Sequence, residues 1–246
     1  DSETGIDTFS KPHSVVALLG SSRPVKWFAY LAIFWGLLLI LFLGLRSSPD
    51  VLGLVLVCCG LGYLYQGPPF RLGYLGIGEP LCWLAFGPFA TAAALMVLAP
   101  RTETAVIPWH EAFMLGSGPA MATTLVLFCS HFHQVVEDAA HGKKSPLVRL
   151  GTRRAAALVP WIVLTTLFLE WIHVFNGNWP ITALLSGLSL PFGAALIHLL
   201  RNHHDQPNYT RGSKFLALIF QALNGLGLSV GLALGPAVGI DLINLN

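Results

Sequence analysis

Charged side chains are scarce in this sequence, and their scarcity decides the class of protein. Lys, Arg, Asp and Glu make up 11% of the 246 residues, whereas a soluble globular domain carries about 25%. Hydrophobic residues make up 54%, and the mean hydropathy is +0.66. This composition excludes an ordinary soluble domain and predicts a polytopic membrane protein. The formal net charge of +2 gives no reason to expect a nucleic-acid partner.

Three common kinds of site are also missing. No zinc spacing such as His-Glu-x-x-His occurs. The glycines Gly73, Gly76 and Gly78 are not a dinucleotide fingerprint, because no strand-helix-strand unit surrounds them. The cysteines lie in apolar runs without paired ligand spacing, so we expect small buried residues and no disulfide framework. They are Cys58, Cys59, Cys82 and Cys129.

Long apolar runs recur along the chain and predict seven membrane helices. A helix needs about 20 mainly apolar residues to cross a bilayer. Proline stands at the start of three runs, where its missing N–H costs nothing. The predicted spans are residues 24–45, 51–65, 79–99, 108–130, 154–175, 180–200 and 214–234. We therefore predict an all-α fold, a polytopic transmembrane helical bundle embedded in the lipid bilayer.

The distribution of positive charge orients these spans. Seven crossings place the N-terminal segment and the loops 66–78, 131–153 and 201–213 on one side of the membrane. Every Lys and Arg lies in or beside these segments except Arg46 and Arg101. Because Lys and Arg concentrate in loops that are not translocated, this side is predicted to be cytoplasmic or stromal. Most of the polar loops share it, which predicts one active mouth above a helical bundle.

The segment 130–151 is a polar island directly after the fourth apolar run. On a helical wheel of residues 129–142, polar side chains occupy one arc and apolar side chains the other. Oxygen ligands at i, i+3 and i+4 lie on one face and suit a hard cation such as Mg²⁺. The lysines Lys143 and Lys144 follow and could neutralise phosphate. The polar arc contains His131, His133, Gln134, Glu137, Asp138 and His141.

A second acidic cluster lies at the N-terminus, on the same predicted side. It consists of Asp1, Glu3 and Asp7. Two separated acidic clusters beside basic residues indicate a site for a metal-bound phosphorylated substrate. Two other interpretations stay open for the island: a solvated helix end with ordinary loop charges, and a zinc site formed by its histidines.

A third polar feature covers residues 63–79 and is rich in Gly, Pro and Tyr. These residues require an irregular backbone, which is tolerated near a membrane mainly against protein or a cavity. Arg71 could meet phosphate. The tyrosines Tyr63, Tyr65 and Tyr74 could line a pocket for an aromatic acceptor, or form an interfacial aromatic belt.

Taken together, these segments resemble the UbiA superfamily of intramembrane prenyltransferases. Residues 1–7, Asp-Ser-Glu-Thr-Gly-Ile-Asp, are similar to the second half of that family's first aspartate-rich motif, and residues 137–143 to its second. Residues 65–79, His131-Phe-His-Gln134 and residues 142–146 are similar to the 1,4-dihydroxy-2-naphthoate phytyltransferases of cyanobacteria and plastids. The resemblance covers essentially the whole chain.

The resemblance implies a bundle of nine helices, of which this chain would contain the third to the ninth. We expect one transmembrane prenyltransferase domain over residues 1–246, incomplete at its N-terminus. Residues 1–23 would hold the first motif and a cytoplasmic loop, and residues 131–153 the second motif and its loop. Gln134 departs from the family pattern, because it stands where the second motif begins with an acid.

The resemblance also implies the chemistry: a phytyl or related prenyl group moves from its diphosphate to 1,4-dihydroxy-2-naphthoate with decarboxylation. Mg²⁺ would be the cofactor, in a cyanobacterial inner or thylakoid membrane or a plastid membrane. The expected metal ligands are Asp1, Asp7, Gln134, Glu137 and Asp138. The four acidic residues among them, all except Gln134, are also the expected catalytic residues. The expected substrate-binding residues are Arg71, Lys143, Lys144, Tyr63, Tyr65, Tyr74 and His133.

Other functions stay open. The same fold could act on homogentisate, a chlorophyllide or 4-hydroxybenzoate. A transporter should place acids in the middle of spans, but only Glu170 lies clearly within one, near its end. An assembly subunit without activity is the remaining alternative. The oligomeric state and the prenyl length stay open as well.

Overall fold

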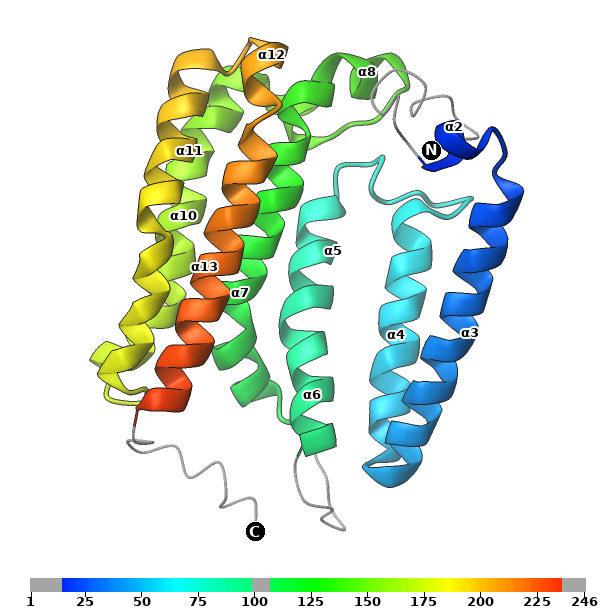
Figure 1. Ribbon diagram of the computed structural model, residues 1–246, viewed down its shortest axis with the longest axis vertical. Helices are drawn as coiled ribbons and strands as arrows, with labels where there is room; N and C mark the ends of the chain where they lie inside the picture. Colours follow the sequence, from blue (N-terminus) through cyan, green and yellow to red (C-terminus); the bar gives the residue numbers. More distant parts are fainter. Residues whose placement is uncertain (1–14, 99–106, 236–246) are drawn as a thin grey trace.

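The computed structural model describes residues 15–98 and 107–235, and every regular element in these two ranges is helical (Figure 1). Seven helical segments there are long and apolar enough to cross a membrane. They are Arg23–Arg46, Pro49–Gln66, Gly78–Leu98, Trp109–Ala140, Thr152–Phe175, Ile181–His203 and Pro207–Leu234. The predicted all-α transmembrane bundle and its seven spans are therefore confirmed.

The first two spans form a helical hairpin at one edge of the bundle (Figure 1). The short α2 (Val15–Leu19) precedes α3 (Arg23–Arg46), and α4 (Pro49–Gln66) follows after a two-residue turn. That turn is capped, because the Asp50 N–H donates to the Ser48 hydroxyl at 3.3 Å. Only 6% of the most apolar window of α3 and 11% of that of α4 is buried. Both helices therefore turn apolar side chains outward, as contact with lipid requires.

The third span changes its helical pitch at Pro88. The chain runs through α5 (Gly78–Leu84), a π-helical stretch η1 (Ala85–Phe89) and α6 (Ala90–Leu98). Proline lacks an N–H and clashes with the preceding turn, so the helix widens locally. In this stretch Gly87 faces α7 (Trp109–Ser130), and a Cβ on Gly87 would lie 2.6 Å from the Cβ of Ala120. Small residues thus let the two helices approach closely.

The helix α7 is the centre of the bundle. It packs against α5, η1 and α6 on one side and against α10 (Thr152–Phe175) and α13 (Ser213–Leu234) on the other. The sixth span combines a 3₁₀ stretch, η3 (Ile181–Ser189), with α11 (Leu190–His203). The largest apolar side chains of the core come from these helices and the loops beside them. They include Leu125, Phe132, Leu147, Leu196, Leu200 and Phe220.

Glu170 is the acid that the sequence places within a span. It lies on α10, and its side chain is buried inside the bundle. Its side chain is 1% exposed, and the Asn224 amide on α13 donates to Glu170 Oε2 at 2.9 Å. A Cβ on Gly118 of α7 would lie 2.5 Å from Glu170 Cγ. This polar pair therefore connects α10 and α13 inside the bundle.

The prediction of buried cysteines holds only in part. Cys129 on α7 is buried, Cys58 and Cys82 are half-buried, and Cys59 on α4 is exposed. The prediction is wrong for Cys59, because α4 lies at the edge of the bundle and turns that face outward. An apolar residue on a membrane helix needs no protein cover.

The polar island does not form the single helix that the wheel assumed. After α7 ends at Ser130, the chain makes a 3₁₀ turn, η2 (Phe132–Gln134), before α8 (Val135–Ala140) and α9 (Pro146–Leu150). The turn changes the helical register, so the predicted polar and apolar arcs are wrong. His131 and Asp138 are buried, whereas Val136 is 69% exposed. The island, the loop between α4 and α5, and α12 (Pro207–Thr210) lie at the same end of the bundle (Figure 1).

Candidate active site

Two polar loops hold one another at this end of the bundle: the loop between α4 and α5, and the loop between α8 and α9. The Lys144 N–H donates to the Tyr74 carbonyl at 2.7 Å. The Arg149 guanidinium donates to the carbonyls of Leu75 and Lys144. Gly76 has a φ of 76°, and a Cβ there would overlap the Lys144 carbonyl oxygen. The second motif and the tyrosine-rich loop are therefore parts of one surface.

A buried cluster of charged side chains lies where these loops meet the helices. Its members are Glu79 from α5, His131 from the end of α7, Asp138 from α8 and Lys143. His131 Nδ1 lies 2.9 Å from Asp138 Oδ2, and Lys143 Nζ lies 3.2 Å from Asp138 Oδ1. On the other side of the ring, His131 Nε2 lies 3.6 Å from Glu79 Oε1. The imidazole thus stands between two carboxylates.

Asp138 and Glu79 differ in the hydrogen bonds that their carboxylate oxygens accept. The Asp138 side chain is 1% exposed, and each of its oxygens accepts a hydrogen bond. An ionised carboxylate can only accept hydrogen bonds. The proton in the bond between His131 and Asp138 is therefore assigned to Nδ1 of His131. Glu79 Oε1, in contrast, is buried and accepts no hydrogen bond from the residues that the structure describes. The cluster therefore contains one fully satisfied carboxylate and one that still needs a donor.

The predicted aromatic residues divide into two groups. The half-buried ring of Tyr65 packs beside the cluster, since a Cβ on Gly78 would lie 3.1 Å from its edge. The Tyr74 ring lies beneath the Arg71 guanidinium, 5.9 Å from centroid to Cζ. Tyr63 is exposed, and its hydroxyl donates to the Pro68 carbonyl at 2.9 Å. Tyr63 thus stabilises the loop, while Tyr65 and Tyr74 lie at the site.

Four other predicted residues, His133, Gln134, Glu137 and Lys144, belong to the same polar island. None of them forms one of the cluster's hydrogen bonds or ion pairs in the part of the chain that the structure describes. His133 and Gln134 face one another, with 3.2 Å between their Nε2 atoms. Glu137 is half-buried, and its carbonyl accepts from His141 Nδ1 at 2.9 Å. Lys144 is exposed. The predicted residues Asp1 and Asp7 lie outside the described residues.

Sequence reasoning did not include two members of the cluster, Glu79 and His131, among the site residues. Signals for both were present. Glu79 follows the glycine-rich loop at the start of a span, and His131 belongs to the polar island. The wheel placed His131 in the same arc as five other polar residues, so it could not show which of them turns inward. Only the turn at the end of α7 decides that.

The donor atoms suit a hard divalent cation in part. Carboxylate oxygens of Asp138, Glu79 and Glu137 and the amide oxygen of Gln134 are ligands of the right type. However, the described residues contain no group of three His, Cys, Asp or Glu side chains close enough to hold an ion. The unpartnered buried oxygen of Glu79 shows that the site has unused capacity. A metal would therefore fit here only with ligands from elsewhere, such as a substrate or the N-terminal acids.

Comparison with known protein families gives a clear result. Residues 1–224 match the UbiA prenyltransferase family. The chain belongs to this family. It is therefore a multi-pass membrane protein of the prenyltransferase class, and enzymes of this family generally use a divalent metal ion.

Three curated relatives of the chain are named as phytyl- or octaprenyltransferases. The chain is 38% identical over 235 residues to the 2-carboxy-1,4-naphthoquinone phytyltransferase of Synechocystis sp., covering 94% of this chain and 73% of that protein. It is 36% identical over 238 residues to the chloroplastic 2-carboxy-1,4-naphthoquinone phytyltransferase of Arabidopsis thaliana, covering 95% and 62%. It is 26% identical over 172 residues to the 1,4-dihydroxy-2-naphthoate octaprenyltransferase of Mycobacterium tuberculosis, covering 68% and 56%. No solved structure matches the chain.

Proposed function

We propose that this protein transfers a phytyl or related prenyl group from its diphosphate to 1,4-dihydroxy-2-naphthoate, with loss of the carboxylate as CO₂. The observation that carries the proposal is the Glu79–His131–Asp138–Lys143 cluster, held against an aromatic loop at one end of a membrane bundle. Anion-binding lysine, acidic ligands and an aromatic wall meet there. Two relatives with more than a third of their aligned residues identical are phytyltransferases for a naphthoquinone precursor.

Lys143 and Asp138 form the donor side of the site. The Lys143 ammonium lies at the mouth with 13% of its side chain exposed, so it can pair with a diphosphate oxygen while it stays near Asp138. Lys144 and Arg71 line the same surface and would neutralise further charge on the leaving diphosphate.

Magnesium is the cofactor that we propose, held by Asp138 with Glu137, Gln134, Asp1 and Asp7. When bound, it would polarise the diphosphate and stabilise the charge that develops as the allylic C–O bond breaks. Within the chain, His131 donates to Asp138 and so fixes the orientation of that carboxylate.

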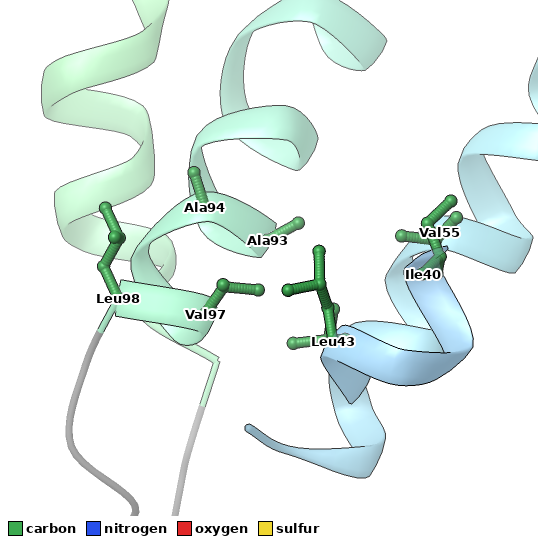
Figure 2. Close-up of a pocket in the computed structure, with 8 residues that line it drawn as sticks. Ile40, Leu43, Val55, Ala93, Ala94, Val97 and Leu98 are labelled. Atoms are coloured by element: carbon green, nitrogen blue, oxygen red, sulfur yellow. The ribbon is translucent and has the colours of Figure 1, made fainter. Parts of the chain in front are cut away.

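The prenyl tail would lie along the third span. An apolar cavity of about 340 Å³ opens at the far end of this span, between α6 and the α3–α4 hairpin (Figure 2). It is remote from the charged cluster: Val97 lies 18 residues beyond Glu79, about 27 Å along a helix that rises 1.5 Å per residue. Figure 2 shows Leu43, Ala93 and Val97 pointing into the same space. A long apolar chain anchored at the cluster would extend towards this cavity.

On the acceptor side, Tyr65 would provide the wall for the naphthalene ring. The ring carbon that carries the carboxylate attacks the allylic carbon as the C–O bond to diphosphate breaks. The carboxylate then leaves as CO₂, and its bonding electrons restore the aromatic ring. Apolar walls exclude water that would otherwise capture the allylic cation. The whole site would face the cytoplasm or stroma of a cyanobacterial or plastid membrane, in line with the bias of Lys and Arg.

The test is diphosphate release and product formation by the purified protein in detergent, with Mg²⁺ and phytyl diphosphate. We expect turnover with 1,4-dihydroxy-2-naphthoate and little with homogentisate, a chlorophyllide or 4-hydroxybenzoate. Turnover with one of these instead would assign a different acceptor to the same fold. If no acceptor gives diphosphate release, the protein is not the enzyme proposed, and a role in transport or assembly takes its place.

A further inference from the structure

Among residues 15–98 and 107–235, no group donates a hydrogen bond to one buried oxygen of Glu79 in the charged cluster. The Glu79 side chain is 12% exposed, and this oxygen is Oε1. His131 Nε2 lies 3.6 Å from this oxygen, which is too far for a hydrogen bond. Buried carboxylate oxygens are rarely left unsatisfied, so this oxygen can accept a hydrogen bond from a group that the described residues do not supply.

His131 does not supply that donor, because its Nε2 lies 3.6 Å from Glu79 Oε1 and Asp138 holds the ring through Nδ1. Its Nδ1 is already bonded to Asp138 at 2.9 Å, and the Lys143 ammonium lies 3.5 Å from the same nitrogen. The ring is buried and is thereby held in one orientation. Glu79 is thus separated from the donor side of the site by a fixed imidazole.

The surroundings of Glu79 suit an aromatic ligand. The Tyr65 ring lies against Gly78, the residue before Glu79, and a Cβ on Gly73 would lie 3.2 Å from the same ring. An aromatic wall beside a carboxylate acceptor matches a ring that carries a phenolic hydroxyl, because the ring stacks and the hydroxyl donates.

We propose that Glu79 accepts a hydrogen bond from a ring hydroxyl of the aromatic acceptor and so determines its orientation. This role rests on the proposed function. It makes the cluster two-sided: Asp138 and Lys143 bind on the diphosphate side, Glu79 binds on the acceptor side, and His131 stands between them. A single metal ion bound to both carboxylates would have to displace the His131 ring, which argues against Glu79 as a shared metal ligand.

The test measures ligand affinity without turnover. Three probes are titrated separately into the detergent-solubilised full chain: 2-naphthoate, 1-hydroxy-2-naphthoate and 4-hydroxy-2-naphthoate. For the unaltered protein, at least one hydroxylated probe should bind roughly 10- to 100-fold more tightly than 2-naphthoate, the range for a hydrogen bond to a charged group. In Glu79→Ala that preference should disappear, while the affinity for 2-naphthoate should stay within about twofold.

Matched variants separate this role from the alternatives. Asp138→Asn should weaken Mn²⁺ binding, followed by electron paramagnetic resonance, and leave the preference for the hydroxyl intact. Glu79→Ala should do the reverse. Glu111→Ala on α7, in the first turn at the opposite end of the bundle, should change neither. Glu79→Gln keeps the shape of the side chain and should retain part of the preference for the hydroxyl. It serves as a control in case the alanine variant folds poorly.

Two results would overturn the proposal: an unchanged hydroxyl preference in Glu79→Ala, or a loss of Mn²⁺ affinity in that variant as large as in Asp138→Asn. The second would make Glu79 a metal ligand. A protein that binds none of the three naphthoates refutes the proposed acceptor itself, which is a different outcome from binding them without a preference for the hydroxyl.

Discussion

Replacing Asp138 by alanine is the most direct test of the cluster. The change removes both hydrogen bonds that the carboxylate accepts, from His131 at 2.9 Å and from Lys143 at 3.2 Å. The Lys143 ammonium then remains largely buried, at 13% exposure, without its counterion. Removing one partner of a buried ion pair costs about 3–5 kcal/mol. Because Lys143 reaches the mouth of the site and can gain water there, we expect a loss near 3 kcal/mol.

Two assays follow from this calculation. Thermal unfolding in detergent should show a clear drop in midpoint for Asp138→Ala and a smaller drop for Asp138→Asn, which still accepts one bond. Adding Lys143→Met to Asp138→Ala removes the unpaired charge and should recover much of the stability. Prenyl transfer should be abolished in all three variants, because none keeps the carboxylate.

Either of two results would contradict these roles of Asp138 and Lys143. Wild-type turnover in Asp138→Ala, assayed with Mg²⁺ and both substrates, would remove Asp138 from the catalytic machinery. If the double variant were less stable than Asp138→Ala by the full cost of a second independent change, the two side chains would not be coupled as the distances indicate.

Three further predictions concern the loops and helices around the site. Gly76→Ala forces a side chain into a left-handed conformation and against the Lys144 carbonyl, and should destabilise the protein by at least about 1 kcal/mol; an unchanged unfolding midpoint would contradict the contact. Gly87→Leu should separate α7 from the third span and lower the midpoint further, whereas Gly53→Leu, where a Cβ meets open space, should not. Ala93→Phe fills the apolar cavity and should shift donor preference towards shorter prenyl diphosphates at unchanged acceptor affinity. An unchanged chain-length profile would exclude the cavity from the tail path.

The residues of the island show where sequence reasoning stops. Its composition predicted a charged site at one end of the bundle, and Lys143 Nζ lies 3.2 Å from Asp138 Oδ1 there. The assumption of one continuous helix failed at His131, where the chain turns into η2. Short irregular turns depend on what packs around them, and the burial of Phe132 in the core has no signature in local spacing.

Glu79 illustrates a second limit. It lies 52 residues before His131 in the chain, and no periodicity connects them. Their proximity follows from the packing of the third span against α7. Gly87 of η1 and Gly116 of α7 have no side chains, which lets the two backbones approach.

Composition and apolar run length established the membrane environment and the number of spans, and the Lys and Arg bias predicts the side on which the chemistry lies. These follow from summed properties: a helix needs a minimum apolar length to cross a bilayer, and translocation discriminates against Lys and Arg in short loops. Only the tertiary structure decided which polar side chains meet. That choice depends on turns and on glycine contacts between distant segments, which bury His131 and Asp138, leave Glu137 at the edge, and bring Glu79 to the other face of the same imidazole.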